Sequence, residues 1–113
     1  MTSLYYDLDG KIIKGQDPVM IWADLIKSPR RLVGRNDLFP QIRVSTVWLG
    51  LDHNFGGGKP LIFETMIFLN HRSMEMWRYS TRKKAEEGHQ RALELVRNPL
   101  KRILYIITHL KND

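Results

Sequence analysis

The chain has 113 residues, of which 42% are apolar and 27% charged. These values are close to globular averages, so they exclude extended disorder and predict a single small domain over residues 1–113. There is no cysteine, which excludes disulfides, thiolate nucleophiles and cysteine-based zinc sites.

The charge is basic, with 18 Lys and Arg against 12 Asp and Glu, for a net charge of +6. Such an excess favours anionic partners, although a basic protein kept soluble by its own charge has the same composition. No apolar run approaches the roughly 20 residues that cross a bilayer, and the first residues lack a signal-peptide pattern. We therefore expect no membrane segment and a soluble, intracellular protein.

The N-terminal part predicts a hairpin and a helix. Asp9-Gly10 is a two-residue turn signal within residues 5–13, because Gly adopts positive φ freely. Asp17-Pro18 is typical of a helix start, and Ser28-Pro29 of a helix end. Apolar residues recur at helical spacing between these signals and predict a core-facing stripe, formed by Val19, Trp22, Ala23 and Ile26.

The middle of the chain predicts an antiparallel sheet. Residues 41–51 and 61–69 are rich in β-branched and aromatic side chains and alternate in character, as strands do. Shorter strands are expected at 30–34 and 75–79, with a loop at 36–40. The loop 52–60 leaves the register open, so the sequence does not decide whether Trp48 and Glu64 share a face.

The C-terminal part predicts two helices. Ser80-Thr81 caps a helix to about Arg97, with an inward stripe at Ala85, Gly88, His89, Ala92 and Val96. Asn98-Pro99 ends it and starts a C-terminal helical extension over residues 99–111, although 103–107 is also β-branched enough for a strand. The expected fold is α+β: an antiparallel β-meander with helices packed on one face.

The loop between the two long strands is the first candidate ligand site. Its polar, aromatic and glycine residues are Asp52, His53, Asn54, Phe55, Gly56, Gly57 and Gly58. Successive glycines can turn backbone N–H groups toward an anion, but the following Lys59-Pro60 leads into a strand and not into the helix of a phosphate-binding loop. A purely structural alternative is that Asp52 and Asn54 shape the turn.

A histidine and a carboxylate extend this candidate site. Gly88 lowers helix propensity on the inward stripe, which indicates close packing or space for a ligand beside His89. Glu64 interrupts an apolar strand, and a buried carboxylate needs a partner. We expect His89 and Glu64 to join the loop around a polar pocket, whereas the alternative for His89 is a core histidine with a hydrogen bond.

Basic residues form a second candidate surface for anions or nucleic acid, made of Arg43, Arg78, Arg82, Lys83 and Lys84. Aromatic residues beside them, as in Trp77-Arg78-Tyr79, could stack on bases or fill the core. Asp52-His53 and Asn70-His71 faintly resemble the His-Asn-His nucleases, but residues 75–79 look like strand where another metal ligand is needed. No metal-ligand spacing is recognised, and no cofactor is expected.

Residues 44–68, Val-Ser-Thr-Val-Trp-Leu-Gly-Leu-Asp-His-Asn-Phe-Gly-Gly-Gly-Lys-Pro-Leu-Ile-Phe-Glu-Thr-Met-Ile-Phe, resemble a set of short bacteriophage and prophage proteins. Residues 5–10 and 78–81, with Ala85 and Gly88-His89, add weaker matches. This chain departs from the others by its basic Lys59 and Arg82-Lys83-Lys84, and by the extension from Pro99. The resemblance implies a phage accessory protein that acts in the host cytoplasm.

The expected function is therefore binding and not catalysis. The leading hypothesis is a phage accessory protein that counteracts host defence by binding an anionic ligand, such as a nucleotide signal, or a host protein. The alternatives are a nucleic-acid-binding protein with a basic surface and, less favoured, a metal-dependent nuclease. The apolar stripe of the last helix, formed by Leu100, Ile103, Leu104, Ile107 and Leu110, predicts a homo-oligomer.

Overall fold

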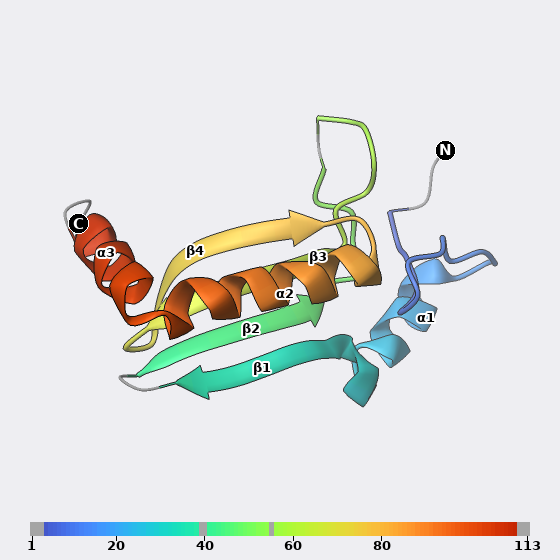
Figure 1. Cartoon of the computed structure of the whole chain (residues 1–113). Coiled ribbons are helices and arrows are strands. Elements are labelled where there is room, and N and C mark those ends of the chain that lie inside the picture. The colour runs from blue at the N-terminus through green and yellow to red at the C-terminus, as the bar shows by residue number, and fades with distance from the viewer. Residues whose placement is uncertain (1–3, 39–40, 55, 111–113) are drawn as a thin grey trace.

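The computed structural model describes residues 4–38, 41–54 and 56–110 and shows an antiparallel sheet with the strand order β1-β2-β3-β4 (Figure 1). Each strand pairs with its sequence neighbour, so the sheet is a meander. The elements are α1 (Pro18–Leu25), a 3₁₀ turn (Pro29–Arg31), β1 (Leu32–Leu38), β2 (Ile42–Trp48), β3 (Phe63–Leu69), β4 (Arg72–Tyr79), α2 (Arg82–Arg97) and α3 (Pro99–Leu110).

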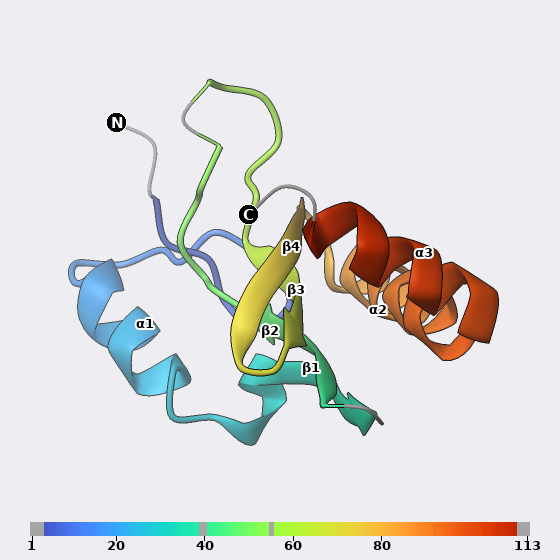
Figure 2. The ribbon, with the colours of Figure 1, turned by 90° about the vertical axis from the view of Figure 1, so that its left-hand side faces the viewer.

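Helix α2 lies across one face of the sheet and contacts all four strands, whereas α3 packs on α2 (Figures 1 and 2). The predicted caps of α2 and α3 form: the Thr81 hydroxyl accepts from the Lys84 N–H, and Asn98 Oδ1 accepts from the N–H groups of Leu100 and Lys101. At the start of α1, the Asp17 side chain makes no cap hydrogen bond. Helix α1 lies at the end of the molecule opposite α3. The α+β class and the meander are confirmed.

The core lies between α2 and the sheet because both elements present apolar faces there. Alternate residues of β2 are buried from Ile42 to Trp48, as the predicted alternation requires. The predicted stripe of α2 is buried and includes the expected His89. Near α3 the core consists of Ile42, Val44, Ile67, Ala92, Leu93, Val96 and Tyr105, and near α1 of Tyr6, Leu8, Trp48, Ile62, Phe63 and Ala85.

Strand β1 is longer than predicted, because it continues to Leu38 through residues expected to form a loop. Its polar sequence, with Arg35 and Asp37, resembles a loop, but it forms a sheet edge where such residues reach solvent. Strand β4 also begins earlier, at Arg72. In both cases pairing with the neighbouring strand overrides local propensity.

The apolar stripe predicted for α1 is only partly covered, and the stripe of α3, which the sequence predicts to be left for a second copy, is exposed. In α1, Val19 and the following Ile26 are exposed, and the half-buried Trp22 attaches the helix through a 2.9 Å hydrogen bond from Nε1 to the Leu49 carbonyl. In α3, a helix as favoured over a strand, Tyr105 is buried. The side chains Leu100, Ile103, Leu104 and Ile107 are exposed instead.

Candidate functional site

The glycine-rich loop that follows β2 is held by its own turn residues. Asp52 Oδ1 accepts hydrogen bonds from the backbone N–H groups of Asn54, at 2.8 Å, and Leu61, at 3.1 Å. The Asn54 amide donates across the loop to the Lys59 carbonyl. Gly56, Gly57 and Gly58 are exposed, and the last two have positive φ. These contacts support the turn-shaping interpretation of Asp52 and Asn54; His53 is half-buried, and Phe55 lies outside the described residues.

His89 is a core histidine with a hydrogen bond at each ring nitrogen. Its Nδ1 lies 2.7 Å from Thr46 Oγ1 and its Nε2 lies 2.8 Å from Asn36 Oδ1. The Asn36 oxygen can only accept, so Nε2 carries the proton and Nδ1 accepts from the Thr46 hydroxyl. Thr46 Oγ1 in turn accepts from Thr65 at 2.6 Å. Burial, and then the nearby Arg97 charge, lower the pKa of His89 and favour its neutral form.

Glu64 lies on the opposite face of the sheet from His89. The register pairs Val47 with Glu64 and Trp48 with Phe63, so Trp48 and Glu64 point to opposite faces. The Glu64 carboxylate accepts from Arg78 Nε at 3.1 Å across the β3–β4 pair. The expected pocket of His89, Glu64 and the glycine loop is therefore wrong, because strand alternation separates the two side chains.

The basic candidate residues are also separated. Arg43 is paired with Asp37 at 2.8 Å, and Arg78 with Glu64, on the face of the sheet away from α2. Arg82 donates to the carbonyls of Leu8 and Arg30 and lies over the Phe63 ring, so its guanidinium has a structural role. Lys83 and Lys84 are exposed in the first turn of α2. These five cations do not converge on one surface.

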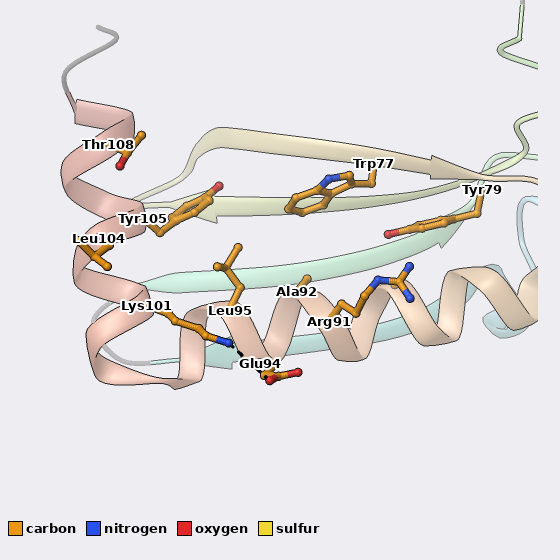
Figure 3. Close-up of a pocket in the computed structure, with 11 residues that line it drawn as sticks. Trp77, Tyr79, Arg91, Ala92, Glu94, Leu95, Lys101, Leu104, Tyr105 and Thr108 are labelled. Atoms are coloured by element: carbon orange, nitrogen blue, oxygen red, sulfur yellow. Dashed lines mark ion pairs between the residues drawn. The ribbon is translucent and has the colours of Figure 1, made fainter.

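A cavity of about 660 Å³ lies instead between α2, α3 and β4, and we call it the α2–α3 pocket (Figure 3). It is within the usual range of small-molecule sites, roughly 300–1,000 Å³. The residues that line it are Trp77, Tyr79, Gly88, Arg91, Ala92, Glu94, Leu95, Lys101, Leu104, Tyr105 and Thr108.

Two aromatic rings, an excess of positive charge and a neutral phenol define the chemistry of the α2–α3 pocket. Trp77 and Tyr79 project from alternate positions of β4 toward α2, and the Arg91 side chain points toward them (Figure 3). Lys101 Nζ lies 3.6 Å from Glu94 Oε1, so the lining carries two cations against one carboxylate. Burial, and then the Glu75 carboxylate, raise the pKa of Tyr105 and keep this phenol neutral.

Gly88 explains how the aromatic wall approaches α2. A Cβ at this position would overlap the Tyr79 ring and hydroxyl, so only glycine admits that ring against the helix. The sequence signals for the pocket were the Gly88 on an inward helical stripe and the aromatic pair on β4. Nothing in the sequence showed that α3 would fold back beside them, and this placement supplies one wall of the open pocket.

Over residues 4–38, 41–54 and 56–110, no group of three or more His, Asp or Glu residues is arranged to hold a metal ion. No helix in the part of the chain that the structure describes is long and apolar enough to span a membrane. Comparisons with protein-family models, curated proteins and solved structures found no match to this chain.

Proposed function

We propose that this protein is a small binding protein that holds an anionic aromatic ligand of the nucleotide class in the α2–α3 pocket. The observation that carries the proposal is a single cavity walled by two aromatic rings, Trp77 and Tyr79, and two cations, Arg91 and Lys101. An aromatic wall suits the flat face of a base, and the cations suit a phosphate.

The interactions available in the α2–α3 pocket favour a ligand that has both an aromatic base and a phosphate. Stacking of a base on an aromatic side chain is worth about 1–3 kcal/mol and is tolerant of base identity. Arg91 is exposed, so its charge alone is screened by solvent and binds a free phosphate weakly. The net charge of +6 adds a general attraction for anions. The combination selects a nucleotide over a nucleoside or inorganic phosphate.

Binding, and not catalysis, is the proposed role of the pocket. Its described lining includes no histidine and no cysteine, and its cation Lys101 is paired with Glu94. The resemblance of residues 44–68 to phage proteins adds a biological setting to the proposal. In that setting, the pocket would sequester a nucleotide signal of the host and so counteract host defence.

The proposal is tested by isothermal titration calorimetry of the full chain with adenosine monophosphate, adenosine and inorganic phosphate. Adenosine monophosphate is expected to bind at least about tenfold more tightly than either part alone. Arg91→Gln and Lys101→Gln should weaken the nucleotide more than adenosine. Trp77→Leu should weaken both, whereas Trp77→Phe keeps an aromatic ring and should retain most of the affinity.

Lys83→Gln is the matched control, because it removes an exposed cation from α2 that does not line the pocket. Unchanged nucleotide affinity in Arg91→Gln and Lys101→Gln, with thermal melts confirming folded protein, would contradict the proposal. A single-stranded oligonucleotide provides a further arm. Steeply salt-dependent binding that these variants leave intact would assign the function to another basic surface.

A further inference from the structure

The exposed side of α3 is an unpartnered apolar stripe. Leu100, Ile103, Leu104 and Ile107 are 74%, 53%, 65% and 46% exposed. Their positions follow i, i+3, i+4, i+7, which places them along one side of a helix. The opposite side holds Tyr105, 7% exposed, which packs into the core. An isolated helix of this length is marginal in water, so α3 depends on what its faces contact.

The spacing of this stripe is the same in both directions. The intervals are three, one and three residues, so a two-fold axis between residues 103 and 104 maps the stripe onto itself. That axis places Leu100 of one copy opposite Ile107 of the other, and Ile103 opposite Leu104. A two-fold interface requires this kind of self-complementary surface.

The charges of α3 favour the same antiparallel arrangement. Residues 99–110 contain no acidic residue, and the cations Lys101 and Arg102 lie in the first turn, where they oppose the positive end of the helix dipole. An antiparallel second copy brings its negative C-terminal end toward these cations. A parallel copy would instead place Lys101 beside Lys101.

We infer that this protein forms a two-fold homodimer through antiparallel packing of α3 against α3. Because Leu104 also lines the α2–α3 pocket, the second copy lies at the rim of that pocket. The dimer does not depend on the proposed ligand and is tested without one.

Sedimentation equilibrium of the full chain at high micromolar concentration should give twice the monomer mass of 13.3 kDa. Ile103→Glu and Leu104→Lys should each give the monomer mass, because each places a charge in the apolar seam. Mixing these two variants should restore the double mass, since the antiparallel register brings the two new opposite charges together. Met20→Glu is the matched control: Met20 is 60% exposed on α1, at the other end of the molecule, and its change should leave the dimer intact.

A monomer mass for the parent chain would overturn the inference, as would a dimer that Ile103→Glu leaves unchanged. If both single variants are monomeric but their mixture does not restore the dimer, the antiparallel register is wrong. Flotation with anionic phosphatidylserine vesicles tests whether the α3 stripe binds a lipid surface instead of a second copy of the chain. A monomeric parent that floats with the vesicles, and an Ile103→Glu variant that does not, would assign the stripe to a lipid surface.

Discussion

Replacing Thr46 by valine tests the hydrogen-bond chain that holds α2 to the sheet. The change conserves shape but removes the hydroxyl that donates to His89 and accepts from Thr65. Thr46 and Thr65 are fully buried and His89 is 4% exposed, so water cannot replace the lost partner. An unsatisfied buried polar group costs about 1–3 kcal/mol, and two are created, so the expected loss of unfolding free energy is about 2–6 kcal/mol.

Thr65→Val is the matched control, because it removes a donor at the end of the chain and leaves the Thr46–His89 hydrogen bond in place. Its expected cost is about 1 kcal/mol, the value of one net hydrogen bond. The double variant should be no less stable than Thr46→Val alone, since the stranded Thr65 hydroxyl is removed as well. Urea denaturation followed by circular dichroism measures all three free energies.

The relative losses of unfolding free energy in Thr46→Val and Thr65→Val test the hydrogen-bond chain. If Thr46→Val and Thr65→Val destabilise equally, or if Thr46→Val costs less than about 0.5 kcal/mol, the hydrogen-bond chain through Thr46 is refuted as a source of stability. A crystal structure of Thr46→Val that keeps the His89 ring in place would show that geometry is preserved and that the cost comes from unsatisfied groups.

Three further predictions concern α2 and its contact with β1. Burial lowers the pKa of His89 in the folded state, so below the ordinary pKa of about 6.5 the unfolded chain binds more protons than the folded one. The urea midpoint should therefore fall as the pH drops below about 6.5. A His89→Gln variant should lose this pH dependence of the midpoint. Gly34→Ala would place a Cβ 2.8 Å from His89 Nε2 and should lower the unfolding free energy by about 1–3 kcal/mol in the same assay. The exposed Gly15 is unsuitable as a control, because its positive φ would strain an alanine there. Lys83→Glu puts a negative charge in the first turn of α2 and should raise the unfolding free energy by about 0.3–1 kcal/mol at low salt; equal gains in high salt would contradict a dipole effect.

The local chemistry of the sequence predicted most of the secondary structure and the inward face of α2. Caps such as Thr81 and Asn98 act on N–H groups within three residues, so they are visible in the sequence. The alternation of β2 and the spacing from Ala85 to Val96 likewise depend only on the period of each element. The α+β class follows from the order of these elements.

The tertiary structure decided where the candidate side chains meet. A shift of one residue in the β2–β3 register would have reversed the relation between Trp48 and Glu64, and a loop of nine residues leaves that register open. The direction in which α3 folds back depends on contacts such as Tyr105 with the core, between residues far apart in the chain. Periodicity identifies which side of a helix is apolar, but only packing decides which side is covered. Packing therefore forms the α2–α3 pocket and leaves the α3 stripe exposed.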